Sequence, residues 1–383
     1  MPVHQLARMP RITIGAGARG GLVDLALGLV PERANVLLCA DPGLRETGMV
    51  DEIADLIRSG GFGVSIFSDI KSDPSVSQAD AAADMARDTQ AELLVALGGG
   101  SALDLGKLVA AVAAEPASAE TYALAAEPFP VARLRTICIP TTSGTGSEAT
   151  RTAILSARDG AKFWYWGEEL KPDEALLDPE LTVSLPPALT AATGIDALVH
   201  AVEAATNRNA NPANNMFAYE AIRLVARHLE LAVTEPHHLP AREGLHRAAL
   251  LAGAAIDNCG TAIAHNIGHA LASLRPLHHG RAVGIAMLAS LPWNLEGNET
   301  AYGACAAAMG ARPTAAGFVS AYEALIRRVG LKVSLEDEFR GVLPETLADQ
   351  MGRPENIAMI HSNHRDASEE DRLVLARAVL SAA

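Results

Sequence analysis

The pattern of apolar residues changes near Pro186-Pro187, and this change limits the folds open to the chain. Before it, short apolar runs alternate with amphipathic segments of helical period, an order typical of a parallel α/β sheet. After it, long helical periods follow one another between polar or Pro/Gly breaks, and no strand pattern is clear. We therefore predict an α/β domain over residues 1–187 and an all-helical domain over residues 188–383.

The length of the chain agrees with two domains, since 383 residues are too many for one ordinary hydrophobic core. The first domain is expected to alternate strands, at residues 36–40, 63–67, 93–97 and 136–139, with helices at residues 49–59, 77–89 and 102–114. The second is expected to contain helices that include residues 189–205, 214–231, 240–259, 315–329 and 368–380.

Charge, apolar run length and cysteine content exclude several classes of protein. The formal net charge of −14, without a visible basic patch, argues against nucleic-acid or anionic-membrane partners. No uninterrupted apolar run of about 18 residues occurs, so no membrane span is expected, and the first residues lack the pattern of a secretory signal. The four cysteines have no C-x-x-C spacing: Cys39, Cys138, Cys259 and Cys305. A disulfide framework is therefore not expected, and a cytoplasmic location fits best.

A glycine-rich loop, Gly98-Gly99-Gly100-Ser101, lies where the strand at residues 93–97 meets the helix at residues 102–114. Glycines at such a junction let backbone N–H groups close on a phosphate, whose charge the helix N-terminus stabilises. A tight turn without any ligand would use the same residues. Because a strand precedes the loop and a helix follows it, we predict that it binds a phosphate.

A second candidate loop, Gly15-Ala16-Gly17-Ala18-Arg19-Gly20, is a literal G-x-G-x-x-G. Only the run from Ile12 to Ile14 precedes it, too short and too near the terminus for a central strand. We therefore rank this loop below Gly98–Ser101 as a pyrophosphate site.

Asp41 stands at the end of the strand at residues 36–40. A carboxylate there can accept hydrogen bonds from a ribose 2′-hydroxyl and repels a 2′-phosphate, so NAD is preferred over NADP. Alternatively, Asp41 starts a turn with Pro42 and Gly43, and the two roles are compatible.

Candidate metal ligands occur in pairs. Asp196 and His200 are four residues apart, so on a helix their side chains project from one face. His265 and His269 repeat this spacing, and a doublet, His278-His279, precedes Gly280. Carboxylate oxygens and neutral imidazole nitrogens are usual ligands of Zn²⁺ and Fe²⁺. A single histidine at helical spacing is more often a satisfied core or surface residue, but two such pairs in one chain favour a metal site.

Taken together, these motifs resemble the iron-containing (metal-dependent, group III) alcohol dehydrogenases over nearly the whole chain. The resemblance rests on an ordered set of segments: Gly98–Ser101 with Asp104 and Lys107, Pro140–Glu148, Asp178–Leu181, Thr190–Glu203, Ala241–Glu243, His265–His269, His279-Gly280 and, weakly, Asn363–Arg365. It implies an α/β dinucleotide-binding domain with a parallel sheet, followed by an all-α metal-binding domain, the fold shared with dehydroquinate synthase.

The resemblance also assigns site residues. It implies that Asp196, His200, His265 and His279 bind a divalent metal, Fe²⁺ by the family name or Zn²⁺ by affinity order. It implies that His269 is an additional histidine near the metal, for which we expect a proton-relay role or a supporting one. The implied NAD-binding positions are Asp41, Gly98, Gly99, Gly100, Ser101, Thr141, Thr142, Lys162 and Leu181. The nicotinamide is expected in a cleft between the domains, facing the metal, and a homodimer or larger homo-oligomer is expected by analogy.

Two regions depart from the family pattern. The aromatic segment Phe163-Trp164-Tyr165-Trp166 replaces a plainer one, and Arg281 and Trp293 follow the His278-His279 doublet where relatives differ. Either region could modify the substrate pocket, and the aromatic segment could equally form a domain or oligomer surface. The departures affect the expected substrate and leave the ligand positions intact.

The expected function is hydride transfer between NAD and a small primary alcohol or its aldehyde, with a metal ion at the reacting oxygen. Three alternatives remain open: a lyase of the dehydroquinate synthase type, a metal-independent enzyme like maleylacetate reductase, and a non-catalytic oligomeric protein that keeps the fold.

Overall fold

The first half of the chain forms a six-stranded parallel sheet. The computed structural model describes residues 3–157 and 160–381. The strands have the order β1-β8-β5-β4-β2-β3, with bounds β1 (Arg11–Ile14), β2 (Asn35–Ala40), β3 (Gly63–Phe67), β4 (Ala91–Gly98), β5 (Arg135–Pro140) and β8 (Glu174–Leu177). The strands predicted at residues 36–40, 63–67, 93–97 and 136–139 are β2 to β5. The run from Ile12 to Ile14 lies in β1, an edge strand.

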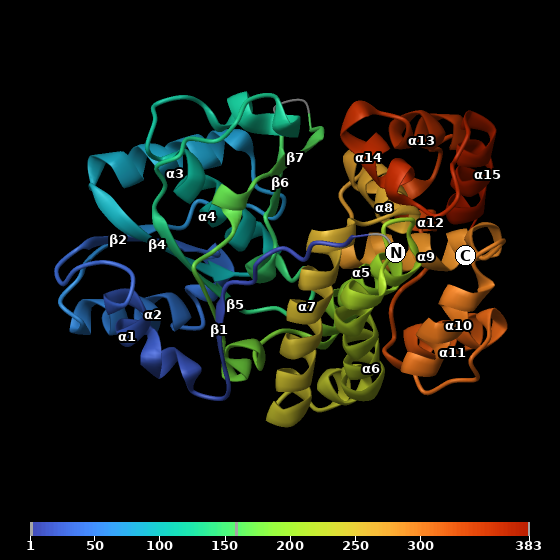
Figure 1. Ribbon diagram of the computed structural model, residues 1–383, viewed down its shortest axis with the longest axis horizontal. Coiled ribbons are helices and arrows are strands. Elements are labelled where there is room, and N and C mark those ends of the chain that lie inside the picture. The colour runs from blue at the N-terminus through green and yellow to red at the C-terminus, as the bar shows by residue number, and fades with distance from the viewer. Residues whose placement is uncertain (1–2, 158–159, 382–383) are drawn as a thin grey trace. The chain divides into compact units, whose positions relative to one another are not determined.

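Helices cover both faces of this sheet (Figure 1). They are α1 (Leu22–Leu27), α2 (Met49–Ser59), α3 (Val76–Asp88) and α4 (Gly100–Val112). Because side chains alternate along a strand, Leu37 and Cys39 of β2 pack with residues of α3 and α4, whereas Val36 and Leu38 pack with residues of α1 and α2. The sheet is therefore buried on both faces, which explains why its central strands read as continuous apolar runs.

An antiparallel hairpin of β6 (Thr152–Ser156) and β7 (Lys162–Trp166) stands apart from the main sheet. It contains the aromatic segment, which the sequence pattern did not predict as a strand. Tyr165 is fully buried in the core cluster that includes α3 and α4. Trp166 is 51% exposed, and the guanidinium group of Arg151 lies 4.4 Å from its ring centre. The aromatic segment thus supports the hairpin of the α/β unit.

Short 3₁₀ helices complete the α/β unit: η1 (Ala18–Gly21), η2 (Pro42–Leu44), η3 (Ala119–Ala125), η4 (Ser147–Ala149), η5 (Glu168–Leu170) and η6 (Pro179–Thr182).

The second half of the described chain is helical and contains no strand. Its helices are α5 (Pro187–Thr206), α6 (Pro212–Thr234), α7 (Leu239–Cys259), α8 (Ile263–Leu274), α9 (His279–Asn294), α10 (Glu299–Ala308), α11 (Ala315–Arg328), α12 (Glu336–Phe339), α13 (Pro344–Met351), α14 (Pro354–Ser362) and α15 (Glu369–Leu380). The five predicted helices correspond to α5, α6, α7, α11 and α15. One hydrophobic cluster joins these helices, and it includes the apolar residues of α5 after Leu189. Nearly every residue of that part of α5 is buried.

The contacts divide the chain into two compact units at residue 186, and the helical unit also takes in two short segments that precede this residue. Residues 3–7 and Ser143–Gly146, which the predicted boundary assigned to the first domain, belong by contacts to the helical unit. Gly146 has φ +61°, and a Cβ there would lie 2.3 Å from the carbonyl oxygen of Ala249 and 2.6 Å from Cα of Gly253. Only glycine fits at this contact, so the loop is fixed against α7 by backbone packing.

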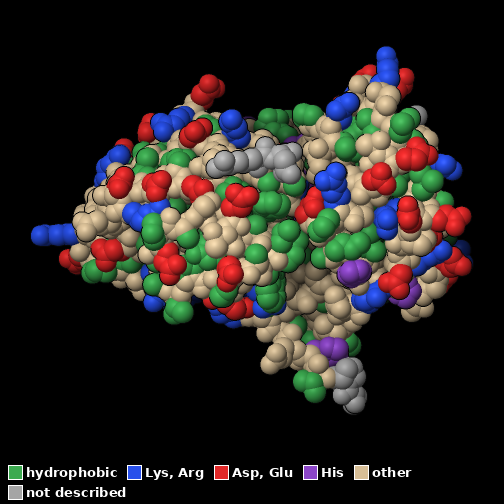
Figure 2. All heavy atoms as spheres, turned by 90° about the horizontal axis from the view of Figure 1, so that it is seen from above, with side chains coloured by type: hydrophobic (Ala, Val, Ile, Leu, Met, Phe, Trp, Pro, Cys, Tyr) green, Lys and Arg blue, Asp and Glu red, His purple; other side chains and the backbone are tan. Residues whose placement is uncertain are grey.

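Charged side chains of both signs lie on the surface. On the face shown in Figure 2, acidic and basic side chains are interspersed. Among the described residues, no helix is both long and apolar enough to cross a membrane. All four cysteines are buried and free.

Candidate functional site

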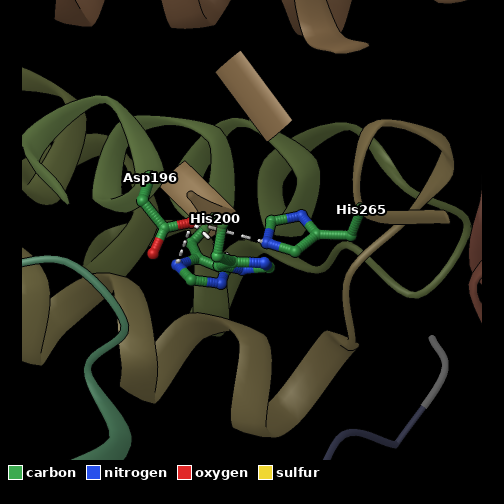
Figure 3. A group of neighbouring side chains, drawn as sticks. Asp196, His200 and His265 are labelled. Carbon is green, nitrogen blue, oxygen red and sulfur yellow. Dashed lines mark ion pairs between the residues drawn. The ribbon is translucent and has the colours of Figure 1, made fainter. Parts of the chain in front are cut away.

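Three helices of the helical unit bring Asp196, His200, His265 and His279 together. The first two lie on α5, His265 is the third residue of α8, and His279 is the first residue of α9. Each offers one ligand atom, and these atoms all lie within 4.8 Å of one another. Figure 3 shows Asp196, His200 and His265 pointing toward a common point. The four side chains that the resemblance assigned to a metal are thus the ones that the fold gathers.

Three of these atoms are buried without a hydrogen-bond partner. Asp196 Oδ1 lies 3.5 Å from His279 Nε2 and 3.7 Å from His265 Nε2, and 3.9 Å from His200 Nδ1. Within the described chain, Asp196 Oδ1, His200 Nδ1 and His265 Nε2 are buried and have no hydrogen-bond partner. Buried polar atoms are seldom left unsatisfied in proteins. Converging carboxylate oxygen and imidazole nitrogen atoms fit a divalent cation of the Zn²⁺ or Fe²⁺ type.

Glycine permits this convergence. A Cβ on Gly280 would lie 2.2 Å from the carbonyl oxygen of Ala192 and 3.2 Å from Cβ of Asp196. The N-terminus of α9 can therefore approach α5 closely only with glycine at this position. This contact explains why the preceding residue, His279, reaches Asp196 and why the exposed His278 does not belong to the cluster.

The electrostatics of the cluster favour a cation. Burial lowers the pKa of His200 to about 3, so this imidazole is neutral at physiological pH. Burial alone would also lower the pKa of His265, but the charges of Glu203 and Asp196 outweigh it and raise that pKa to about 9. Burial works to raise the pKa of Asp196, yet the surrounding imidazoles hold it below its usual range. Two buried carboxylates, Asp196 and Glu203, thus require compensating positive charge.

His269 lies beside the cluster and is not one of its four members. It follows His265 by one turn of α8, and its side chain is half-buried. Its ring centre lies 5.4 Å from that of His279 and 6.3 Å from that of His265. This is the neighbourhood that the resemblance implied for an additional histidine.

The α/β unit brings most of the predicted cofactor residues together at the C-terminal ends of β2, β4 and β5. Gly98 has φ +148°, and a Cβ there would lie 2.9 Å from Cβ of Asp41. The Thr141 N–H donates to the Gly98 carbonyl at 2.9 Å, and a Cβ on Gly99 would lie 3.3 Å from the Thr142 side chain. In an open parallel sheet, ligands bind at this edge of the strands.

The helix α4 begins at this loop, with Gly100 and Ser101 as its first residues. Its N-cap, Gly99, provides no side chain to accept hydrogen bonds from the first turn. A helix of 13 residues whose first N–H groups lack a side-chain cap is suited to an anion such as a phosphate.

Asp41 makes the turn that was considered as its alternative role. Its Oδ1 accepts the Gly43 N–H at 2.8 Å, at the start of η2. The carboxylate is partly exposed, and a carboxylate has a second oxygen for a ligand.

Two predicted cofactor residues are engaged elsewhere. The Lys162 ammonium group, on β7, lies 2.8 Å from Asp73 Oδ1 and donates to Ser156 Oγ at 3.0 Å. Leu181 is 3% exposed and packs in the core cluster with sheet residues. The described contacts therefore do not bring either residue to the glycine loop.

The literal G-x-G-x-x-G loop already binds a carboxylate of the protein. Asp178 accepts the backbone N–H groups of Gly17 at 3.1 Å and Arg19 at 3.2 Å. The Arg19 guanidinium group lies 2.7 Å from Asp178 and 2.7 Å from Glu180. The N–H groups that a pyrophosphate would need are thus used within the fold, which agrees with the lower rank given to this loop.

Sequence reasoning missed Glu203 as a residue of the site. It is 2% exposed and accepts from Nδ1 of His265 at 2.6 Å. The available signal was its position on α5 three residues after His200, which places it near the same helix face.

Arg281 and Trp293, which differ from the family pattern, make contacts within the helical unit. Arg281 donates to the Lys332 carbonyl at 2.7 Å and pairs with Glu338 at 2.7 Å. The Trp293 indole N–H donates to Asp371 at 2.9 Å, and the Arg365 guanidinium group lies 4.4 Å from its ring centre. These contacts account for both residues without a substrate.

Comparisons with known proteins identify the family of the chain. Two family models match: iron-containing alcohol dehydrogenase over residues 10–179, and the C-terminal part of the Fe-containing alcohol dehydrogenase family over residues 190–379. Long-chain-alcohol dehydrogenase 1 of Geobacillus thermodenitrificans is 37% identical over 284 residues, which are 74% of this chain and 71% of that protein. The 1,3-propanediol dehydrogenase of Klebsiella pneumoniae is 33% identical over 330 residues, covering 82% and 84% of the two chains.

The fold is also that of solved members. Sulfoacetaldehyde reductase from Bifidobacterium kashiwanohense, solved in complex with NAD+, superposes with a TM-score of 0.89 at 27% identity and full coverage of both chains. The resemblance and the fold class predicted from the sequence are therefore confirmed, and the chain belongs to the iron-containing alcohol dehydrogenase family.

Proposed function

We propose that this chain is a metal-dependent dehydrogenase that transfers a hydride between NAD(H) and a small primary alcohol or its aldehyde. The observation that carries the proposal is the convergence of Asp196, His200, His265 and His279, three of whose ligand atoms are buried without a hydrogen-bond partner in the described chain. The relatives named for alcohol and diol dehydrogenation support the reaction class.

In this proposal the four residues hold one divalent ion, which supplies positive charge to polarise a carbonyl or stabilise an alkoxide. Asp196 and three neutral imidazoles leave such an ion with a net positive charge. Iron is favoured by the family to which the chain belongs, and zinc by the order of affinities.

His269 is proposed to carry the proton that the alcohol hydroxyl loses. Its half-buried ring lies beside His279, whose side chain is 34% exposed, so it has both the neighbourhood and the access that a relay needs. Imidazole titrates near physiological pH, which suits that role.

The α/β unit is proposed to bind NAD through the first turn of α4 and Asp41. The N–H groups at Gly100 and Ser101 would hold the pyrophosphate, and the Asp41 carboxylate would accept from the ribose hydroxyl and repel a 2′-phosphate. The NAD+ in the sulfoacetaldehyde reductase structure supports this choice of cofactor. A homo-oligomeric state and a cytoplasmic location remain predictions.

The test is a screen of primary alcohols and aldehydes with NAD+, NADH, NADP+ and NADPH, with the metal content measured on the same preparation. Sustained NADH formation that stops on chelation and returns with added Fe²⁺ or Zn²⁺ is the expected result. NAD bound without net redox change would favour the lyase, and full activity in metal-free protein would favour the metal-independent reductase. If Asp196→Ala changed neither metal content nor activity toward any substrate, the proposal would fail.

A further inference from the structure

Glu203 contacts the metal cluster through one ligand and also holds the helix that carries it. Its Oε2 accepts the His265 Nδ1–H at 2.6 Å and the Ala262 N–H at 2.7 Å. Its Oε1 accepts the Ala264 N–H at 2.7 Å and, at 3.4 Å, the backbone N–H of His265. The carboxylate is 2% exposed, so these four donors, 59 to 62 residues away in sequence, replace water around it.

These bonds supply a cap that α8 lacks locally. The N-cap of α8 is Ala262, whose side chain cannot accept a hydrogen bond. The first N–H groups of a helix have no partner within it, and a negative charge near them is favourable. Glu203 of α5 therefore fixes the position of the first turn of α8, in which His265 is the third residue.

The same carboxylate sets the tautomer of His265. An ionised carboxylate only accepts hydrogen bonds, so Nδ1 of His265 must carry a proton. The lone pair for a metal is then on Nε2, the atom that lies 3.7 Å from Asp196 Oδ1 and has no hydrogen-bond partner. A ligand imidazole commonly donates its other N–H in this way, and the partner tunes the metal.

We infer that Glu203 is a positioning residue of the metal centre: by binding the first turn of α8 and the Nδ1–H of His265 together, it presents Nε2 to the ion. This inference rests on the proposed metal site. It differs from a purely structural cap, because a cap would affect the folding of α8 but not the tautomer or the ligand strength of His265.

The substitution Glu203→Gln tests the inference because it keeps the shape and removes two of the four acceptor positions. The Gln oxygen can replace one carboxylate oxygen, but the amide NH₂ is a donor and faces N–H groups. If it faces His265 Nδ1, it favours a proton on Nε2, the tautomer that cannot bind the ion. Substitution of such a partner typically weakens metal binding about 10- to 100-fold.

The measurement is the Kd of the full chain for Zn²⁺, by competition with a chelator, for wild type, Glu203→Gln, His265→Ala and Glu355→Gln. Glu355 is a matched control, since it is a buried carboxyl group on α14, 7% exposed, and not a member of the cluster. We expect a 10- to 100-fold higher Kd for Glu203→Gln, a larger loss for His265→Ala, and no change for Glu355→Gln. A folded Glu203→Gln protein that binds Zn²⁺ as tightly as wild type, while His265→Ala does not, overturns the role of Glu203 alone. Equal Zn²⁺ binding by wild type and His265→Ala overturns the proposed metal site itself.

A spectroscopic readout separates positioning from capping. In the Co²⁺-substituted protein, an Nε2-bound His265 has an exchangeable Nδ1 proton that should give a shifted ¹H NMR signal, absent in His265→Ala. In Glu203→Gln this signal should move and exchange faster with water, and an unchanged signal contradicts the inference. If Glu203→Gln does not fold, Glu203→Asp takes its place, since the shorter carboxylate retains the charge but cannot reach all four donors. Wild-type Zn²⁺ affinity and an unchanged signal in Glu203→Asp would likewise overturn the inference.

Discussion

Each unit contains a buried polar cluster, and the two clusters balance their charge differently. In the α/β unit, the Lys107 ammonium group is fully buried and donates to four oxygens: Ser147 O at 2.8 Å, Thr150 O at 3.3 Å, Thr150 Oγ1 at 3.0 Å and Thr152 O at 2.6 Å. Asp104 lies 3.5 Å from it. Burial raises the pKa of the nearby Glu148 to about 7, so this carboxyl is largely neutral below that pH. One cation and one carboxylate thus compensate each other.

The cluster of the helical unit is balanced only in part, because the raised pKa of His265 provides one imidazolium charge for two carboxylates. Asp196 and Glu203 contribute two buried negative charges, and a fully buried lysine is not among the residues around them in the described chain. One divalent ion would neutralise both. Lys107 therefore satisfies the oxygens around it within the fold, whereas the ligand atoms of Asp196, His200 and His265 converge on one point, an arrangement that suits a divalent ion.

The largest effect is expected when the negative charge of Asp196 is removed from the cluster of the helical unit. Asp196→Asn keeps the shape but removes the anionic ligand. We expect kcat/KM for the best primary alcohol to fall about 1000-fold or more, because metal contributions to catalysis amount to several kcal/mol. Steady-state NADH formation and bound metal are measured together. Asp366→Asn is the control, since Asp366 is exposed and pairs with Arg208. Normal activity of Asp196→Asn would remove the basis for calling this cluster a site.

Removal of the Lys107 ammonium group tests the role of the buried cluster in the α/β unit. Lys107→Met removes the donor to the buried carbonyl oxygens and the cation beside Asp104, so we expect the α/β unit to lose about 3 to 5 kcal/mol of stability. Two of the three tryptophans, Trp164 and Trp166, belong to this unit. Their fluorescence during urea unfolding, in a Trp293→Phe background, reports on it. The Zn²⁺ affinity of the helical unit should stay at the wild-type value. Loss of Zn²⁺ binding in folded Lys107→Met would show that the two clusters are not independent.

A pH series sharpens the charge balance of the α/β cluster. The pKa of Glu148 is raised from 4.5 to about 7, so the folded state binds its proton more tightly than the unfolded state. The resulting stabilisation is complete below pH 4.5 and is lost as the pH rises through 7. Relative to Glu148→Gln, which mimics the protonated group, the wild-type free energy of unfolding should fall by up to about 3 kcal/mol over this range. Parallel pH profiles for the two proteins would contradict the neutral state of Glu148.

Metal removal gives the smallest expected effect. At a free Zn²⁺ concentration about 100 times Kd, the ion should stabilise the unit that binds it by about 2.7 kcal/mol. Trp293 is the tryptophan of the helical unit, so its fluorescence in a Trp164→Phe/Trp166→Phe background follows that unit. In the Trp164→Phe/Trp166→Phe protein, a chelator should lower the unfolding midpoint of the helical unit. In the same protein with Asp196→Asn added, a chelator should leave that midpoint unchanged. An equal response in both would place the ion elsewhere.

Much of the fold could be predicted because its central elements have simple patterns. The strands β2 to β5 are buried on both faces, and α5, α6 and α7 are long helices of 20 to 23 residues. The hairpin of β6 and β7 and the edge pair of β1 and β8 were missed as strands, since short segments carry weak period-two patterns. The helices α8 and α9 were not given bounds. In α9, which is buried on most sides, the apolar residues are not confined to one stripe.

Parts of the candidate site could be predicted because histidine and aspartate side chains are typical metal ligands and glycine loops are typical phosphate-binding segments. Two pairs at helical spacing, Asp196 with His200 and His265 with His269, and a glycine loop between strand and helix led to residues that the fold brings together, whereas the choice of His279 came from the family resemblance. The role of Glu203 could not be predicted, because its bond to His265 spans 62 residues and depends on how α8 meets α5. Lys162 was assigned to the cofactor by resemblance alone, and its pairing with Asp73 depends on the unpredicted hairpin.

The contact of Gly146 with Gly253 has a consequence for how the chain can be divided. Four residues of the helical unit, Ser143–Gly146, are encoded within the segment that otherwise builds the α/β unit. A fragment starting at residue 186 would lack them and would expose the part of α7 that Gly146 covers. In a circular permutant or a split protein, residues Ser143–Gly146 would therefore have to stay covalently joined to β5 and still pack against α7. Neither unit therefore corresponds to one continuous segment of the chain that could be expressed alone.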